Sequence, residues 1–144
     1  MQAMKITDPP LPSADEASPA YATASGSDGH VLATHCPACG YNNFPPSRVC
    51  AGCMSLDVAP LRLSRQGTLY SYTTLRAGDQ SVYVGYVDLP EKIRLFAELE
   101  GYADGPPAMG SQVELACVRH APGQARKREP VFVFRHLPGQ PHGQ

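Results

Sequence analysis

The sequence predicts a mostly-β protein made of an N-terminal arm, a metal-bound ribbon and a small five-stranded barrel. Two Cys-x-x-Cys pairs lie close together in the first half of the chain, and five runs rich in β-branched and aromatic residues follow. Gly 13 and Pro 15 among 144 residues also make turns frequent and long helices scarce. We expect an arm at 1–28, a ribbon at 29–56, a barrel at 57–138 and a short tail at 139–144.

The arm is rich in proline, alanine and serine, and it shows no sustained hydrophobic period. Such a composition predicts an arm that is mobile or that depends on a partner surface for its order. Any helix in it would be short, at about residues 13–24.

The ribbon carries the strongest signal in the chain. Cys36, Cys39, Cys50 and Cys53 form C-x2-C, ten residues and C-x2-C again. Two such turns bring four thiolates to one cation, at about 2.3 Å per zinc–sulfur bond. Gly40 suits a position of positive φ after the first pair, and Gly52 lies inside the second turn.

Zinc is the expected ion, although a tetrahedron of four thiolates also suits iron. Four protein ligands leave no open coordination position, so we expect a structural metal rather than a catalytic one. His30 and His35 lie nearby in the sequence, and with four cysteines available we expect them at the surface or outside the first ligand shell.

The barrel is predicted from five strands, at 67–75, 81–89, 92–100, 112–120 and 130–136. Five short antiparallel strands in this length fit an OB-fold. Residues 81–89 are apolar on both faces, as in a central strand or one covered by a partner. Cys117 alternates with Val113 and Leu115, which predicts a buried side chain, whereas Glu98 and Glu100 share an outer face.

Net charge, hydropathy and the absence of common motifs reduce the number of functional classes that fit the sequence. A net charge of -1 argues against binding driven by nucleic-acid phosphates. The sequence shows no apolar run long enough for a membrane span and no signal peptide, so we expect a cytoplasmic protein. None of the common hydrolase, metalloprotease or nucleotide-binding motifs is present, which predicts a protein without its own catalytic apparatus.

One local charge cluster is a candidate binding site. Residues 119–136 hold five basic residues against one acidic residue, and Arg126, Lys127 and Arg128 form an uninterrupted run before the last strand. Clustered guanidinium and ammonium groups suit the phosphates of coenzyme A, although a basic loop exposed to solvent explains the run as well.

Several motifs resemble one prokaryotic family, known as domain of unknown function thirty-five, in which a rubredoxin-like zinc ribbon precedes an OB-fold. They are CPACGYNNFPPSRVCAGC, GTLYSYTTL, YVGYVDLPEKIRLFAELEG, MGSQVEL and PVFVFRH, and they span residues 30–136. The chain departs from the family at its N-terminus, where many members have an aromatic-rich helix and this sequence has only Tyr21.

The resemblance implies a non-catalytic subunit that binds a larger thiolase-superfamily enzyme and supports its assembly and CoA-substrate binding. The implied chemistry is thiolytic cleavage, condensation or acyl transfer, in aromatic-compound or secondary metabolism. An alternative is an OB-fold that binds single-stranded nucleic acid, with bases stacked on Tyr70 and Tyr72 of one strand face and on Tyr83. The acidic stretch at 79–104, with six acidic and two basic residues, disfavours that alternative.

Overall fold

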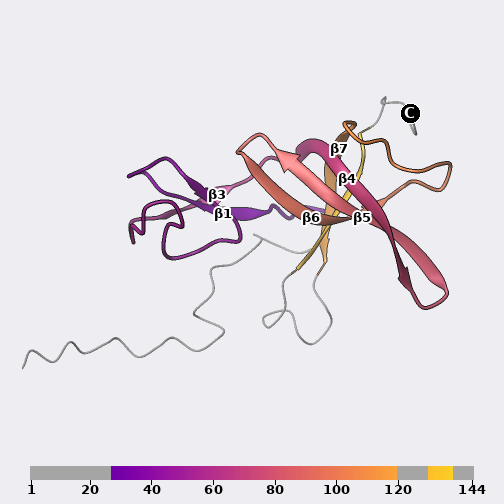
Figure 1. The fold of residues 1–144 in the computed structure, drawn as a ribbon, viewed down its shortest axis with the longest axis horizontal. Coiled ribbons are helices and arrows are strands. Elements are labelled where there is room, and N and C mark those ends of the chain that lie inside the picture. Colours follow the sequence, from indigo (N-terminus) through magenta and orange to yellow (C-terminus); the bar gives the residue numbers. More distant parts are fainter. Residues whose placement is uncertain (1–26, 120–129, 138–144) are drawn as a thin grey trace, which may run out of the picture.

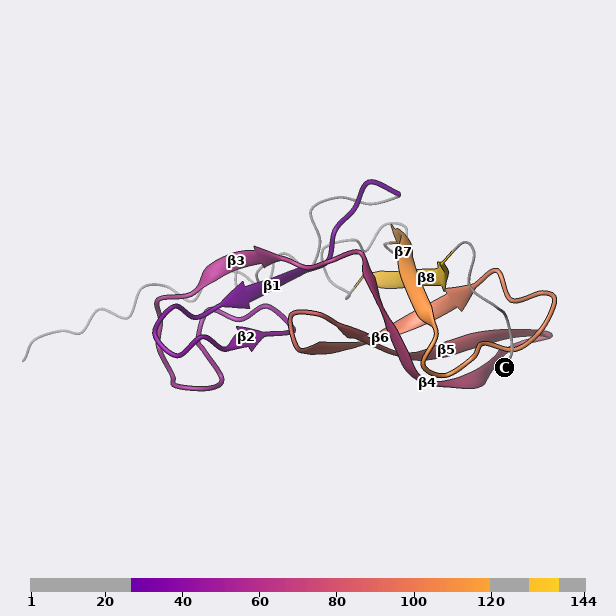
Figure 2. The same cartoon turned by 90° about the horizontal axis from the view of Figure 1, so that it is seen from above.

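The computed structural model describes residues 27–119 and 130–137, which form two small β-sheets. The ribbon strands lie at one end of the molecule and the barrel at the other (Figures 1 and 2). The elements are β1 (Leu32–His35), β2 (Asn42–Asn43), β3 (Ala59–Arg62), β4 (Gln66–Ala77), β5 (Gln80–Leu89), β6 (Ile93–Glu100), β7 (Gln112–Arg119) and β8 (Val131–His136). None of the described segments is a helix that could cross a membrane.

The five strands of the predicted barrel are confirmed, each within two residues of its expected bounds. They close in the order β4-β5-β6-β8-β7, with β7 returning to pair with β4. All pairs are antiparallel except β6 and β8, whose parallel register joins Leu99 to Phe134. The arm, with its predicted short helix, lies outside the described residues apart from its last two positions.

The ribbon sheet has the order β2-β1-β3. Strand β3 was not predicted, because Ala59–Arg62 contains Pro60 and does not alternate in hydrophobicity. Proline is tolerated there because β3 lies at the sheet edge, with β1 as its one neighbour among the described strands.

One continuous hydrophobic core joins the ribbon to the barrel. Val31, Ala33 and Leu63 from the ribbon side pack in the same cluster as Leu69 and Phe134 from the barrel. The Arg65 guanidinium strengthens this junction, since it donates hydrogen bonds to the carbonyls of Gly29, Ser27 and Leu115. The two parts therefore form one packed unit.

Two β-bulges change which side chains face the core. The register shifts at Tyr70, between Leu69 and Ser71, and at Ala116, between Leu115 and Cys117. An extra residue in one strand reverses the inward and outward alternation beyond it. Gly85 pairs with Tyr72, two positions beyond the first bulge, and a Cβ atom on Gly85 would come within 2.2 Å of the Ser71 carbonyl oxygen.

We therefore predict that Gly85→Ala destabilises the barrel by about 2–3 kcal/mol, because the added methyl group collides with backbone that cannot rotate away. Gly105→Ala is the matched control, since a Cβ there meets nothing within 4 Å and should change stability by less than about 0.5 kcal/mol. Urea denaturation of both variants measures the difference. Equal stability of the two variants would contradict the tight strand contact.

Candidate functional site

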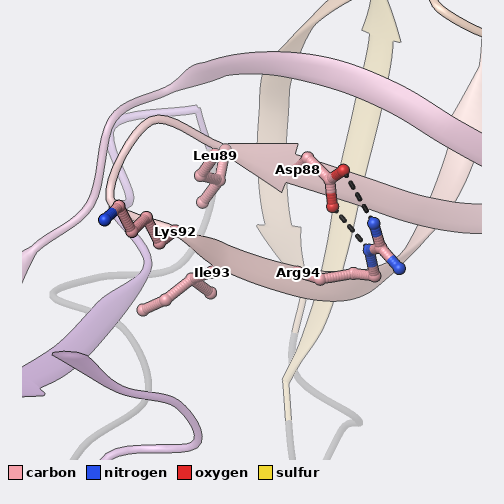
Figure 3. Close-up of a pocket in the computed structure, with 5 residues that line it drawn as sticks. All are labelled: Asp88, Leu89, Lys92, Ile93 and Arg94. Carbon is pink, nitrogen blue, oxygen red and sulfur yellow. Dashed lines mark hydrogen bonds and ion pairs between the residues drawn. The ribbon is translucent and has the colours of Figure 1, made fainter. Parts of the chain in front are cut away.

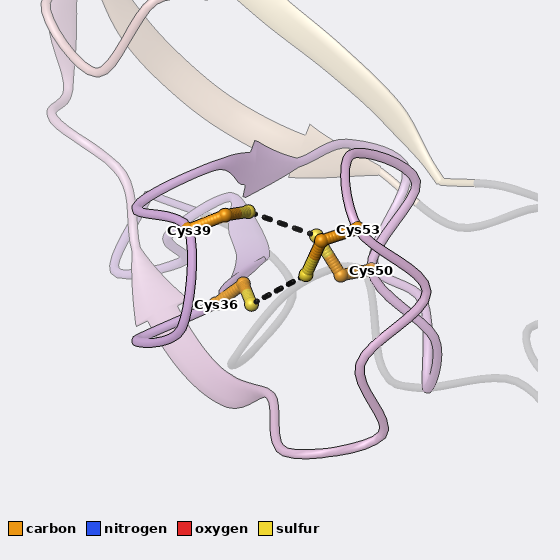
Figure 4. Close-up of side chains that lie close together, drawn as sticks. All are labelled: Cys36, Cys39, Cys50 and Cys53. Atoms are coloured by element: carbon orange, nitrogen blue, oxygen red, sulfur yellow. Dashed lines mark hydrogen bonds between the residues drawn. The ribbon is translucent and has the colours of Figure 1, made fainter.

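The four predicted metal ligands converge in space. Their sulfur atoms all lie within 4.8 Å of one another, contributed by two loops that face each other (Figure 4). The Sγ atoms of Cys36 and Cys53 are 3.6 Å apart, as are those of Cys39 and Cys50. A tetrahedral ion with bonds of about 2.3 Å separates its sulfurs by about 3.8 Å, so the cluster has the dimensions of a tetrathiolate metal site.

The two loops are built alike. In the first, the Cys36 N–H donates to the Tyr41 carbonyl and the Gly40 N–H donates to the Cys36 carbonyl. In the second, the Cys50 N–H donates to Ser55 and the Met54 N–H donates to Cys50. Each loop thus turns its two sulfurs to one side.

The expectation for Gly40 is confirmed, since its φ is 78°, but the positive-φ residue of the second loop is Met54, with φ 69°. The left-handed position is the residue directly after each second cysteine, which is glycine only in the first loop. At Gly52 the absence of a side chain matters for packing, because a Cβ there would come within 3.2 Å of the Tyr41 side chain.

The sulfurs influence one another's ionisation. The Tyr41 N–H lowers the pKa of Cys39, but burial and the three neighbouring thiols together raise this pKa to about 12. Burial raises the pKa of Cys50, but hydrogen bonds from the backbone of Cys53 and Gly52, together with the nearby Asn43 side chain, lower it to about 6. Four thiolates this close repel one another, and a bound cation removes that repulsion.

Residues around the ligands attach the site to the rest of the fold. The ring nitrogen Nδ1 of His35 lies 2.7 Å from Oδ1 of Asn42, and among the described residues the sulfur cluster does not include His35. Nδ2 of Asn42 donates to the Glu91 carbonyl in the β5–β6 turn at 2.9 Å. Asn43 is buried and accepts a hydrogen bond from Ala51 in the second loop. Neither asparagine was singled out from the sequence. The one signal available was the pair of adjacent amide side chains, Asn42 and Asn43, between the two cysteine pairs.

A second feature is a row of exposed apolar side chains on the outer face of the barrel, which we call the apolar row. Tyr86 pairs with Phe96 across β5 and β6, with ring centroids 5.6 Å apart. Tyr70 lies at the bulge beside Tyr86, and Val131 of β8 lines the same groove as Phe96. The four side chains are 40% to 55% exposed. A groove of about 320 Å³, lined in part by Leu75, Phe96 and Val131, adjoins the row.

The bulges overturn two expectations about side-chain direction. Tyr70 and Tyr72 do not share a face, because Tyr70 is exposed while Tyr72 packs against the core. Cys117 is not in the core beside Val113 and Leu115, because the bulge at Ala116 gives the inward position to Val118. Cys117 is only partly buried.

Ion pairs border the apolar row. Arg94 makes two hydrogen bonds to the Asp88 carboxylate, at 2.6 and 3.0 Å, beside a hollow at the β5–β6 turn that Leu89, Lys92 and Ile93 also line (Figure 3). The Asp88 hydrogen bond raises the pKa of Arg94, whose guanidinium also stacks 3.4 Å from the Tyr70 ring centroid.

Two further pairs lie on the same barrel surface. They join Arg119 to Glu98 and Arg135 to Glu114. Glu98 and Glu100 both lie on the outer face of β6, as expected from the alternation of that strand. The basic run Arg126, Lys127 and Arg128 lies outside the described residues.

Fold and site together define a protein with a cysteine-bound ribbon followed by an OB-fold barrel. Residues 23–59 match the family model for the rubredoxin-like zinc ribbon domain of ChsH2, and residues 62–119 match the model for its C-terminal OB-fold domain. The chain belongs to this zinc-ribbon and OB-fold family, as the resemblance predicted.

Relatives and a solved structure agree with this assignment. The chain is 38% identical over 98 residues to the benzoylsuccinyl-CoA thiolase subunit BbsA of Thauera aromatica, covering 65% of this chain and 67% of that protein. It is 40% identical over 73 residues to BbsA of Geobacter metallireducens, covering 48% of this chain and 49% of that relative. A solved structure titled Ltp2-ChsH2(DUF35) aldolase superposes with a TM-score of 0.60 at 27% identity, over 74% of this chain and 84% of that one.

We predict that Cys36→Ser or Cys50→Ser lowers the bound metal from about one equivalent per chain to a small fraction and unfolds the ribbon, because four thiolates form the complete ligand set. Elemental analysis and circular dichroism of the purified chain measure both effects. Cys117→Ser is the control and should keep its metal, since Cys117 is not part of the sulfur cluster. Full metal content in the Cys36→Ser chain would contradict the assignment.

Proposed function

We propose that this chain is a non-catalytic accessory subunit that binds a larger thiolase-superfamily enzyme acting on acyl-CoA substrates. The names of the two relatives support this kind of partner, since both are named as subunits of a benzoylsuccinyl-CoA thiolase. By the same names, thiolytic cleavage of an aromatic acyl-CoA is the reaction that we favour for the complex, over condensation or acyl transfer.

The apolar row is the structural observation that supports a partner protein. Contiguous apolar side chains left exposed on a small chain are typical of contact surfaces, and aromatic residues are enriched at the centres of such contacts. The row crosses four neighbouring strands, and the adjoining groove gives it a hollow into which a partner side chain can fit.

The nucleic-acid alternative is less well supported. A single-strand binder needs cations along its stacking platform to meet the phosphates. Here the arginines beside the apolar row are held by carboxylates, Arg94 by Asp88 and Arg119 by Glu98. These pairs neutralise the border of the row, which favours a protein surface over a polyanion.

The metal that we propose is zinc, in a structural role. Zinc is the usual ion of a closed four-cysteine site, and it neutralises the thiolates without redox chemistry. A reducing compartment such as the cytoplasm keeps the four thiols available for the ion, and we place the complex there.

We predict that Phe96→Ser weakens binding to the thiolase-like partner at least about tenfold, because it removes a large side chain from the middle of the apolar row. Leu56→Ser is the control: Leu56 is 77% exposed, lies in the ribbon segment and is not part of the row. Co-purification from the native source, followed by titration of the purified partner, gives the measurement. If both variants weaken binding equally, or if only nucleic acid co-purifies, the proposal is wrong.

The basic run gives a separate prediction about CoA. Reversing Arg126, Lys127 and Arg128 to glutamate should raise the KM of the complex for its CoA substrate about tenfold or more, because phosphate contacts are lost. Arg76→Glu, a charge reversal of an exposed residue on β4, is the control. Steady-state kinetics of the reconstituted complex measure both, and an unchanged KM in the triple variant removes this role.

A further inference from the structure

Asn43 is an unusual residue in the ribbon. Its side chain is only 3% exposed, and Asn43 and Thr34 are the two buried polar residues among those that the structure describes. Oδ1 of Asn43 accepts a hydrogen bond from the Ala51 N–H at 2.7 Å. The amide nitrogen Nδ2 is buried and has no hydrogen-bond partner within the described part of the chain. An unsatisfied buried N–H costs free energy, so its retention needs an explanation.

The orientation of this amide is fixed by its neighbour. Because the Ala51 N–H requires an acceptor, the oxygen of Asn43 must face Ala51, and the nitrogen therefore faces the other way. Ala51 directly follows Cys50, so its bond to Asn43 places the Asn43 side chain beside this ligand, where it is one of the groups that lower the pKa of Cys50. That sulfur already accepts a hydrogen bond from the Gly52 N–H at 3.3 Å.

We propose that Asn43 is a positioning residue of the metal centre, whose Nδ2 donates a hydrogen bond to the Cys50 thiolate when the metal is bound. A metal-bound thiolate carries negative charge and spare lone pairs, and it is a better acceptor than a thiol. The nitrogen that lacks a partner here thus gains one from the loaded site. One side chain both braces the second cysteine loop, through Oδ1, and stabilises one of its ligands, through Nδ2.

The neighbouring residue, Asn42, connects this arrangement to the barrel. Asn42 and Asn43 make up strand β2, and successive side chains of a strand point to opposite faces. Asn43 contacts the metal loop, while Asn42 donates to the Glu91 carbonyl in the barrel. The two amides therefore connect the metal centre to the β5–β6 turn through a single strand.

The test compares Asn43→Ala with Thr34→Val in the full-length chain. Thr34 pairs with Asn43 across the β1–β2 ladder and is also buried, but its hydroxyl bonds to Ser47 rather than to a cysteine. The first measurement is zinc release to excess chelator, which Asn43→Ala should accelerate about tenfold or more. The second is the reduction potential of the iron-loaded chain, which should fall in Asn43→Ala because a lost N–H donor leaves the sulfur richer in electrons.

The potential separates positioning from mere structural support. Thr34→Val should lower stability and leave the potential of the iron-loaded chain unchanged. If Asn43→Ala also leaves the potential unchanged, Asn43 only braces the loop and the proposal is overturned. If Asn43→Ala does not fold, Asn43→Ser replaces it in the same measurement. The serine hydroxyl is a shorter donor than the asparagine amide, so the reduction potential of the iron-loaded Asn43→Ser chain should lie below that of the parent chain. A potential equal to the parent's would contradict the proposal.

Discussion

The convergence of four sulfur atoms is the constraint on which the rest of the ribbon depends. Its strands are two to four residues long, and a segment of this size buries too little apolar surface to fold alone. Two loops with the same hydrogen-bond pattern point their sulfurs at one centre, and the four thiolates would repel one another there unless a cation were bound. The metal therefore contributes folding free energy directly, and we expect the ribbon and the ion to be gained or lost together.

The barrel benefits from this constraint because the two units share their interior. Val31 and Leu63 belong to the same buried cluster as the barrel residues, and Arg65 bonds three carbonyls drawn from both sides of the junction. Asn42 adds a polar tie to the β5–β6 turn. Loss of the metal should therefore affect more than a peripheral loop, since it would expose one side of the common core.

The sequence alone predicted the cysteine site and the barrel strands, because both depend on local patterns: ligand spacing in one case and runs of β-branched residues in the other. The sequence-based prediction failed where a single extra residue in a strand reverses the direction of the side chains that follow it. The bulges at Tyr70 and Ala116 turned Tyr72 inward and Cys117 out of the core, and strict alternation cannot reveal either. Met54 at positive φ and the proline-containing β3 were missed for a related reason, since tertiary context overrode a local preference.

The same bulge that misled the prediction helps to build the apolar row. Without the extra residue at Tyr70, the inward and outward positions on one side of the bulge in β4 would be exchanged. The row shared with Tyr86 and Phe96 would then be interrupted. Gly85 permits the close strand contact just beyond the bulge. Arg94 then covers one face of Tyr70 while Asp88 balances the charge of Arg94, so this end of the aromatic surface is nearly neutral. A small barrel arranged in this way keeps an apolar surface on the outside, where the partner that we propose can contact it.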